Sequence, residues 1–383
     1  VRGSWARVGS GTEPFRLTRL TTFQRGGNNG FLRLSPTLPN KDLRPEQTES
    51  IEFGADIGLL DGRLGLDVTW YKTNTTNQLF TVALPVGSGA SEFFTNGGDV
   101  ENKGIEVMFR SVPLQVSDFR WGLDVNFSRN RNVVKKLNDE RPSLELTRDY
   151  IRAYRIEEGK PFGMVYSRGF RRDEQGRVIV GSNGIPLVTD GMTVPVANFN
   201  PDWLASITNS LRYKNFRFNF VIDHRQGGTI VSLRNAILYA DGLTKATLKG
   251  REGGLIFGEN FFEHEEAVLE DGSPNDIEVD AETFWRSIGG RNAPVGEAFV
   301  EDATNTRVRE ATLTYSFSPE TLSRLGISSM SVSLVGRNLF FIHRKSENLD
   351  PDILVNTAPS ALGFESFTPP TPRTFGLDVR FTF

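Results

Sequence analysis

The sequence predicts an all-β chain that crosses a membrane as strands of a transmembrane, antiparallel, up-and-down β-barrel. Three features lead to this fold class. Ten segments alternate apolar with polar residues, long and short connections alternate between these segments, and the polar strand faces carry charges of both signs. Because a barrel strand exposes only every second residue to lipid, the chain as a whole stays hydrophilic, with a mean hydropathy of -0.32.

The composition of the 383 residues excludes several classes of protein. No run approaches the roughly 18 apolar positions of a membrane-spanning helix, so a helical membrane protein is excluded. A formal net charge of -3 gives no electrostatic support for nucleic-acid binding. The absence of cysteine removes disulfides, thiolate metal sites and cysteine nucleophiles, and it fits an oxidising compartment such as a periplasm. The chain begins at Val1 with no initiator methionine or signal peptide, so we expect it to be a fragment.

The last ten residues, 374–383, show the alternation most clearly. Their apolar members are separated by polar residues or glycine, which is the period of a strand with one apolar and one wet face. The chain ends on this apolar face, at Phe383. An outer-membrane strand can place such a face against lipid, whereas the alternative is an edge strand of a soluble sheet.

The same alternation predicts nine further strands. None of them contains any of the 19 prolines, as a hydrogen-bonded ladder requires. Asp61-Gly62 is a tight-turn signal between the second strand and the third. The nine predicted strands lie at 1–9, 51–59, 64–70, 105–109, 121–127, 205–213, 216–222, 311–317 and from 332 onward.

The connections between these strands alternate strictly in length. The long ones run over 10–49, 73–102, 131–202, 227–306 and 342–373, and the short ones over 60–63, 111–119, 214 and 318–330. Short periplasmic turns and long extracellular loops are typical of outer-membrane barrels. Long surface loops are also where binding residues tend to lie. Both termini are therefore expected on the periplasmic side.

The strand faces opposite the apolar residues are predicted to line a water-filled interior. Charges in the middle of a strand suit a wet lumen and would be costly against lipid. For any one of them the alternative is pairing with its neighbours in a solvated wall. The residues on these faces are Glu52, Asp56, Asp67, Glu106, Arg110, Asp124, Asn126, Arg212, Arg217, Asp223, Arg337, Asp378 and Arg380.

Six residues break the rule, because they are basic and yet share the parity of the lipid-facing residues. All six lie at strand ends that the loop pattern places outside the cell, where facing lipid costs about 0–1 kcal/mol instead of about 2–4 at mid-membrane. Guanidinium groups also match phosphate oxygens. We therefore predict a collar that contacts lipopolysaccharide, the alternative being that these side chains snorkel into water or pair with loop acids. The residues are Arg7, Lys72, Arg129, His224, Arg307 and Arg309.

The longest connection carries the candidate ligand-binding residues. Ile230, Leu233, Ile237 and Leu238 follow helical spacing before a glycine, which predicts a short helix over the barrel mouth. Aromatic residues of the same connection are able to stack on sugar rings or to dock a lid protein, and packing within the loop is the alternative. The candidates for facing substrate or lid are Trp285, Tyr239, Asp241 and Phe284.

No catalytic motif accompanies these features. His264-Glu265 lacks the second histidine of a zinc-protease helix, and neither a G-x-S-x-G elbow nor a phosphate-binding P-loop occurs. The acids at 173–174 and at 350 and 352 do not follow the spacing of a calcium-binding EF-hand loop. The sequence therefore predicts neither an enzyme nor a cofactor or metal site.

Several stretches together resemble one family. They read NPDW at 200–203 followed by YKNF at 213–216, EAFVEDATNTRVREATLTYSF at 297–317, GRNLF at 336–340, PTPRTFGLDVRFTF at 370–383 and ENKGIE at 101–106. Taken together, these stretches resemble the SusC/RagA family of TonB-dependent outer-membrane transporters. The last of them resembles a motif shared by TonB-dependent receptors more widely.

The resemblance implies a barrel of about 22 strands, of which this chain, 1–383, is the C-terminal portion. The N-terminal plug domain, the segment that binds TonB and about twelve strands would lie outside it. It also implies a SusD-like surface lipoprotein as partner, import of an oligosaccharide or a peptide, and recognition of Phe383 by the barrel-assembly machinery. The alternative is a self-contained ten-stranded surface adhesin or binding barrel, in which 1–9 would pair with 374–383. A soluble multi-sheet enzyme does not fit the strict loop alternation.

Overall fold

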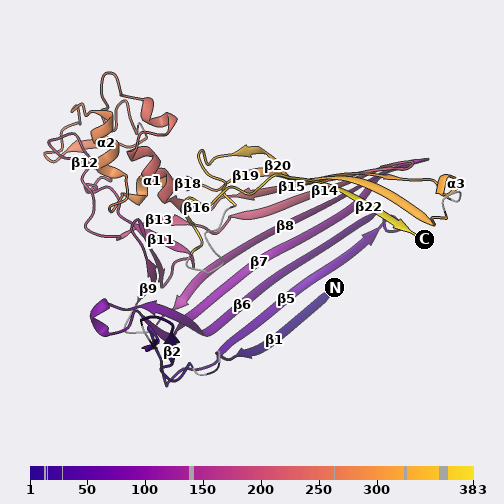
Figure 1. The fold of residues 1–383 in the computed structure, drawn as a ribbon, viewed down its shortest axis with the longest axis horizontal. Helices are drawn as coiled ribbons and strands as arrows, with labels where there is room; N and C mark the ends of the chain where they lie inside the picture. The colour runs from indigo at the N-terminus through magenta and orange to yellow at the C-terminus, as the bar shows by residue number, and fades with distance from the viewer. Residues whose placement is uncertain are drawn as a thin grey trace.

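The computed structural model describes residues 1–12, 14, 16–27, 29–137, 142–262, 264–322, 326–352 and 361–383, and ten of its strands form one antiparallel sheet (Figure 1). Each of the ten pairs with the next one along the chain, so the predicted up-and-down order is confirmed. A short strand, β4 (Thr37–Leu38), adds in parallel to β7. The ten strands are β1 (Arg2–Ser10), β5 (Glu46–Leu59), β6 (Leu64–Ala83), β7 (Glu92–Val116), β8 (Phe119–Lys136), β14 (Trp203–Tyr213), β15 (Phe216–Gln226), β19 (Asn305–Ser316), β20 (Ser329–Arg344) and β22 (Thr374–Thr382).

The turns gather at one end of the sheet and the loop connections at the other, and both chain termini lie at the turn end (Figure 1). The predicted connection 73–102 is wrong in length, because β6 runs on to Ala83 and β7 begins at Glu92, which leaves only 84–91 between them. The shortest turn consists of Lys214 and Asn215, which join the paired residues Tyr213 and Phe216. Lys214 has a φ of 50°, the left-handed conformation that two-residue hairpin turns use because it matches the twist of the flanking strands. This geometry holds the ends of β14 and β15 in register.

The sheet is open between its first and last strands. β1 pairs with β5 and β22 pairs with β20, and within the described part of the chain β1 and β22 are not bonded to each other. The closure that a self-contained ten-stranded barrel requires is therefore not formed. The sheet is a partial barrel, as the fragment interpretation predicts.

The described parts of the two longest connections fold into a lobe at the loop end of the sheet (Figure 1). The largest hydrophobic core of the protein lies here, around residues such as Tyr154, Phe257 and Phe284. These connections are therefore packed structure with their own interior. The strands that these two connections contribute are β9 (Ser143–Arg148), β10 (Arg152–Glu157), β11 (Met164–Ser167), β12 (Val178–Val180), β13 (Val194–Asn198), β16 (Thr229–Ser232), β17 (Ala267–Leu269) and β18 (Val300–Asp302). The connection after β20 adds β21 (Phe364–Glu365), which pairs with β16, and a separate hairpin joins β2 (Thr21–Gln24) to β3 (Phe31–Leu34).

Two short helices belong to the lobe, α1 (Leu233–Ala240) and α2 (Ala281–Ile288), and α3 (Pro319–Leu322) follows β19. The helix predicted from the spacing of apolar residues is confirmed as α1, although Ile230 belongs to β16. α1 begins after Ser232, whose side chain accepts a hydrogen bond from the backbone N–H of Asn235 at 3.0 Å, as an N-cap serine does. In the described part of the chain no helix has the length and apolar character needed to cross a membrane.

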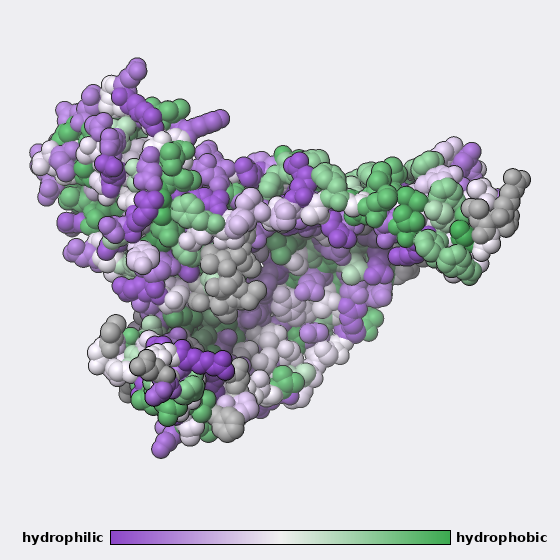
Figure 2. Space-filling view, viewed as in Figure 1, coloured by the Kyte–Doolittle hydropathy of each residue, from purple (hydrophilic) through white to green (hydrophobic). Residues whose placement is uncertain are grey.

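The two faces of the sheet differ in chemistry. Phe53 and Trp70 stack on the convex face with ring centroids 6.1 Å apart, yet they remain 60% and 41% exposed. Figure 2 shows apolar side chains gathered along the strands toward the turn end, and a hollow on the concave side. Apolar surface of this extent is unfavourable in water, at roughly 25 cal/mol per Å², but is suited to lipid.

Candidate functional site

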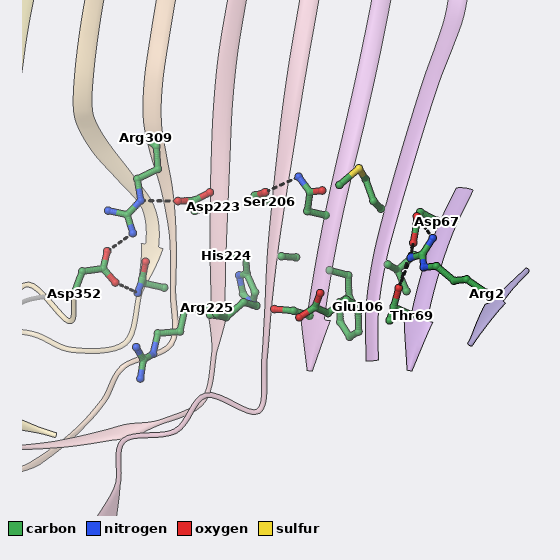
Figure 3. Close-up of a pocket in the computed structure, with 18 residues that line it drawn as sticks. Arg2, Asp67, Thr69, Glu106, Ser206, Asp223, His224, Arg225, Arg309 and Asp352 are labelled. Carbon is green, nitrogen blue, oxygen red and sulfur yellow. Dashed lines mark hydrogen bonds and ion pairs between the residues drawn. The ribbon is translucent and has the colours of Figure 1, made fainter. Parts of the chain in front are cut away.

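A cavity of about 590 Å³ lies on the concave face of the sheet (Figure 3). Residues of β1, β6, β7, β8, β14, β15 and β19 line it, together with Asp352 from the connection that follows β20. Charges of both signs face the cavity, as the sequence predicts for a wet lumen. The charged lining residues are Arg2, Asp67, Glu106, Asp223, Arg225, Arg309 and Asp352.

At one side of this cavity Arg2 is fixed by β6. Its guanidinium donates two hydrogen bonds to the carboxylate of Asp67, at 2.8 and 2.6 Å, and a third to the hydroxyl of Thr69 at 2.6 Å. Gly54 lies between them as the cross-strand partner of Arg2, and a Cβ there would stand 2.7 Å from Arg2 Nε. The glycine therefore makes room for the arginine side chain to lie across β5 and reach β6.

At the other side Arg309 joins a strand to a loop. Its Nε donates to Asp223 at 2.6 Å and its Nη2 to Asp352 at 2.6 Å. Asp352 also lies 3.5 Å from Nη1 of Arg307, which is 3% exposed and 3.3 Å from Asp350. Two arginines and three carboxylates thus connect the wall at β15 and β19 to the segment after β20.

The prediction that Arg307 and Arg309 face lipid is wrong, and a β-bulge is the reason. Val221 lies opposite Glu310 and Ile222 lies opposite Val308, so Arg309 is the extra residue of β19. One extra residue transfers every following side chain to the other face of the sheet. Arg307 therefore shares the concave face with its partner Asp223, and both arginines leave the predicted collar.

Of the other predicted collar residues, Arg7, Lys72 and Arg129 lie on the convex face, whereas His224 is among the residues that line the 590 Å³ cavity. Arg129 pairs in register with the apolar Ile105 and is exposed. Arg7 donates a hydrogen bond to Gln47 on the neighbouring strand. Lys72 forms an ion pair with Glu101 at 3.0 Å, and His224 stacks on Trp203 with ring centroids 4.6 Å apart. Contact of these residues with lipopolysaccharide stays a prediction.

The strand register adds two basic residues that sequence reasoning missed. Lys72 lies opposite Lys103, and Lys103 lies opposite Arg131, so three cations stand side by side on the convex face. Their parity alone would have placed Lys103 and Arg131 with the lipid-facing residues. The convex collar is therefore denser on β6, β7 and β8 than predicted.

Three of the four ligand-side candidates lie around a second cavity, of about 530 Å³, in the lobe. Tyr239 and Asp241 come from the end of α1 and Trp285 from α2, and the two aromatic rings meet edge to face at 4.6 Å. Arg251, Asp280, Glu282 and Arg286 complete the charged part of the lining. Binding of a ligand here stays a prediction.

The fourth candidate, Phe284, is placed differently. It is 1% exposed and packs against Phe257, Phe261 and Trp285 in the core of the lobe. Phe284 lies on the buried side of α2, so the expected contact with substrate or lid is wrong for this residue. The alternative of packing within the loop holds for it.

The polar groups around the lobe cavity have distinct environments. Trp285 is 3% exposed, and its indole N–H has no hydrogen-bond partner among the described residues. Burial raises the pKa of Tyr239, with the acids Glu301 and Glu347 adding to the shift, so its hydroxyl stays protonated and can donate. The backbone N–H of Thr283 lowers the pKa of Asp280, the N-cap of α2, so this carboxylate stays charged. The cavity therefore offers neutral donors beside fixed charges.

Within the described ranges no group of three or more histidine, aspartate or glutamate side chains is arranged to hold a metal ion. Three of the acids that lack the EF-hand spacing, Asp173, Asp350 and Asp352, form ion pairs with arginines. Asp173 forms an ion pair with Arg177 at 2.7 Å, and Asp350 and Asp352 hold Arg307 and Arg309. These carboxylates serve the structure of the loops.

Comparisons with known proteins agree with this architecture. The model of the family described as "TonB dependent receptor-like, beta-barrel" matches residues 1–242. TonB-dependent receptor P26 of Formosa agariphila is 23% identical across 100% of this chain and 40% of that protein. TonB-dependent receptor SusC of Bacteroides thetaiotaomicron is 26% identical across 88% of this chain and 33% of that protein.

Among solved structures, the RagAB peptide transporter has a similar fold, with a TM-score of 0.73 at 18% identity over 100% of this chain and 40% of that chain. A further relative, TonB-dependent receptor P3 of Formosa agariphila, is 28% identical across 50% of this chain and 22% of that protein. The chain thus spans well under half the length of the relatives that it matches. Because the family model covers more than half of this chain, the protein belongs to the TonB-dependent receptor-like β-barrel family, whose members are outer-membrane proteins.

Proposed function

We propose that residues 1–383 are the C-terminal portion of the barrel of an outer-membrane importer. In this proposal the plug domain, the segment that binds TonB and the remaining strands belong to a part of the protein outside this chain. The importer takes up an oligosaccharide or an oligopeptide, working with a SusD-like surface lipoprotein and with TonB. It is not an enzyme; the similar proteins are receptors and a transporter.

The observation that carries the proposal is the two-faced wall. The convex face exposes aromatic rings such as Phe53 and Trp70, which suits lipid, while the concave face holds a 590 Å³ cavity lined by charged side chains. A polar cargo passing along the concave face would meet hydrogen-bond donors and acceptors throughout. An adhesin binds through its outer loops alone, so an adhesin function would not explain why the inner cavity is lined by charged side chains.

The lobe cavity supports capture of a polar ligand before it enters the barrel. It combines the aromatic faces of Tyr239 and Trp285 with the charges of Asp241 and Arg251. Aromatic faces stack on sugar rings and also pack against peptide side chains, so the cavity fits either cargo. The buried indole N–H of Trp285 would gain a partner if a ligand carbonyl or hydroxyl reached it.

Two features of the sheet support the proposal that it lies in an outer membrane. Arg7, Lys72 and Arg129 stand at the loop end, where lipopolysaccharide phosphates would lie, and we assign them to that contact. Phe383 follows β22, and we propose that it acts as the barrel-assembly signal. Both assignments place the loop end of the sheet outside the cell and the turn end in the periplasm.

Uptake by intact cells tests the proposal. Strains that carry the full-length protein would be given labelled oligopeptides and labelled oligosaccharides, with and without a functional TonB protein. Import of one class that stops without TonB supports the proposal and identifies the substrate class. Surface binding of both classes with no TonB-dependent uptake of either would refute import and favour a binding barrel.

Removing the lipoprotein partner tests the proposed partnership with a SusD-like lipoprotein. Deletion of a SusD-like lipoprotein encoded beside this protein should lower the affinity for cargo while the barrel remains in the membrane. Equal uptake with and without that lipoprotein would refute the partnership and leave import itself standing.

A further inference from the structure

A group of basic residues lies on the convex face at the loop end of β7 and β8. Lys103 of β7 lies directly opposite Arg131 of β8 and, on its other side, opposite Lys72 of β6. Arg129 stands two residues before Arg131 on β8, so its side chain points to the same face. Lys103, Arg129 and Arg131 are all exposed. We refer to these three residues as the convex basic cluster.

Lys72 is not part of the cluster because a carboxylate holds it. Its Nζ lies 3.0 Å from Oε2 of Glu101, and Nζ of Lys135 lies 3.3 Å from Oε1 of the same carboxylate. The side chain of Glu101 is only 8% exposed, so lysines engage both of its oxygens in a protected position. Among the described residues, no member of the convex basic cluster forms an ion pair or a side-chain hydrogen bond. Glu101 therefore does not balance the charge of the cluster.

The parts of the protein that lie outside this chain are placed away from the cluster by the proposed function, on which this inference rests. Further strands would continue the sheet from its open edges at β1 and β22, and β5 and β6 separate β7 from the edge at β1. A plug domain would fill the lumen on the concave side. The convex face of β7 and β8 therefore meets the surroundings of the barrel.

An apolar belt next to the cluster indicates which surroundings these are. Trp70 pairs in register with Ile105, two residues from the lysine of the cluster, and stacks on Phe53 with ring centroids 6.1 Å apart. Phe127, two residues from the nearer arginine, contacts Trp203 at 5.8 Å. Aromatic residues gather where the hydrocarbon of a membrane meets the headgroups. Two residues span about 7 Å along a strand, so the cluster stands at the level of the headgroups.

The cluster is unfavourable by itself. Like charges directly opposite each other on neighbouring strands destabilise a sheet, because their Cβ atoms are only about 4.5–5.5 Å apart. Lys103 and Arg131 form such a pair, and the backbone ladder fixes both positions. An anion that contacts both side chains would turn their repulsion into attraction.

The chemistry of the partner follows from the side chains and from their place above the belt. A guanidinium group binds two oxygens of a phosphate with parallel hydrogen bonds, and an ammonium group adds a compact charge. A phosphate group carries several oxygens around one centre, so it can accept from Lys103 and Arg131 together. A phosphorylated lipid carries acyl chains below this group, where they would cover the belt. Such a lipid matches both features, whereas a soluble anion matches only the cluster.

We propose that the convex basic cluster binds the phosphate group of a phosphorylated lipid headgroup in the leaflet around the barrel. Lys103 and Arg131 hold the phosphate from neighbouring strands, and Arg129 adds a third cation on the side of the belt. Lys72 contributes less because Glu101 holds it. The inference deepens the proposed placement in an outer membrane, since it narrows a collar of cations to one defined site.

Lipid binding to the purified full-length protein tests this site. The probes are fluorescently labelled lipid A with its two phosphates and the dephosphorylated form, which has the same sugars and acyl chains. Titrations of the delipidated protein in detergent should show at least tenfold tighter binding of the phosphorylated probe at low salt. This preference should shrink as salt screens the charges. Equal affinity for the two probes would overturn the proposal.

Two lysine variants separate the site from general surface charge. K103Q should weaken binding of the phosphorylated probe about tenfold, the lower end of what one charge-assisted hydrogen bond contributes, and should leave the dephosphorylated probe unaffected. K72Q is the matched control, because it makes the same change at the neighbouring position of the same row, where Glu101 already holds the lysine. We expect a clearly smaller loss in K72Q. Equal losses in the two variants would refute a specific site.

Inorganic phosphate distinguishes a lipid from a soluble anion. At a concentration equal to that of the labelled lipid, inorganic phosphate should displace almost none of it, because free phosphate makes no contact with the belt. Substantial displacement under this condition would assign the cluster to a soluble anion and would overturn the proposal.

Thermal unfolding of the delipidated protein tests whether carboxylates from elsewhere occupy the cluster. If they do not, K103Q relieves repulsion, and the unfolding midpoint stays the same or rises. A lower midpoint in K103Q, together with no preference for the phosphorylated probe, would show that acids from another part of the protein or from a second copy fill the cluster, and would overturn the proposal. Normal TonB-dependent uptake with no phosphate preference would refute this inference alone. A phosphate preference without any TonB-dependent uptake would refute the proposed import alone.

Discussion

Among the ion pairs that join the connection between β20 and β22 to the wall, the buried pair of Asp350 with Arg307 is predicted to contribute strongly to stability. Asp350 and Arg307 are both buried, and Oδ2 of Asp350 lies 3.3 Å from Nη1 of Arg307. Asp350 also accepts hydrogen bonds from the backbone N–H groups of Asp352 at 3.1 Å and Thr371 at 3.2 Å. Replacing Asp350 with alanine therefore removes two backbone contacts and leaves a buried cation with less compensation.

The size of the effect follows from these distances. Two unit charges 3.3 Å apart interact by about 5 kcal/mol at an effective dielectric constant of about 20. Asp352, 3.5 Å from the same nitrogen, retains part of this attraction for Arg307. We therefore expect D350A to cost about 2–3 kcal/mol, somewhat below the roughly 3–5 kcal/mol of a fully broken buried pair.

Native-state hydrogen exchange measures this cost where it arises. The amide of Thr371 should exchange about 30 to 150 times faster in D350A, because about 1.4 kcal/mol corresponds to a factor of ten. D350N keeps an oxygen acceptor but loses the charge, so the exchange rate of the Thr371 amide in D350N should lie between the rates in D350A and in the unmodified protein. E282A is the matched control, because it breaks an exposed ion pair with Arg286. The amides around Glu282 should exchange only slightly faster in this variant. Similar exchange in D350A and E282A would refute the argument that burial makes this pair important.

Three further predictions follow from the placement of single residues. Phe284→Ala should destabilise the lobe by about 3–5 kcal/mol, measured by urea unfolding, because the side chain fills the core; a change in ligand affinity with unchanged stability would contradict this. Neutralising Arg7 and Arg129 together should lower the amount of lipopolysaccharide that co-purifies, and neutralising Arg309 should not, because Arg309 faces the cavity; equal losses would refute the assignment of faces. Deleting Phe383 should lower the amount of assembled barrel in the outer membrane without lowering synthesis, and normal membrane levels on an immunoblot would contradict its role as an assembly signal.

Local pattern determined most of the barrel wall. The period-two alternation depends only on which side of a strand each residue occupies, so it identified all ten strands of the sheet and their order. The alternation of long and short connections then placed both termini at the turn end, as Figure 1 shows. Asp67 and Asp223 were correctly assigned to the inner face by the same parity.

The period-two rule assigned residues of β19 to the wrong face at the point where the hydrogen-bonded ladder between β15 and β19 is irregular. A single extra residue at Arg309 transfers Arg307 to the concave face, and nothing in the local sequence marks the position of that bulge. The contacts of Arg309 with Asp223 and of Arg307 with Asp350 then depend on where a distant segment returns to the sheet. Only the tertiary structure decides such pairing.

The candidate site divides in the same way. Sequence composition pointed to Tyr239, Asp241 and Trp285, and the packing of α1 against α2 gathered them around one cavity. The same packing buried Phe284, because successive residues of a helix point in different directions and only one face can meet the core. The sequence by itself determined the strands, their order and which face of a regular strand is wet, because these depend on near neighbours in the chain. The bulge, the cross-strand pairing of Lys103 with Arg131 and the folding of the long connections into a lobe were decided by the tertiary structure, because they depend on which distant segments pack together.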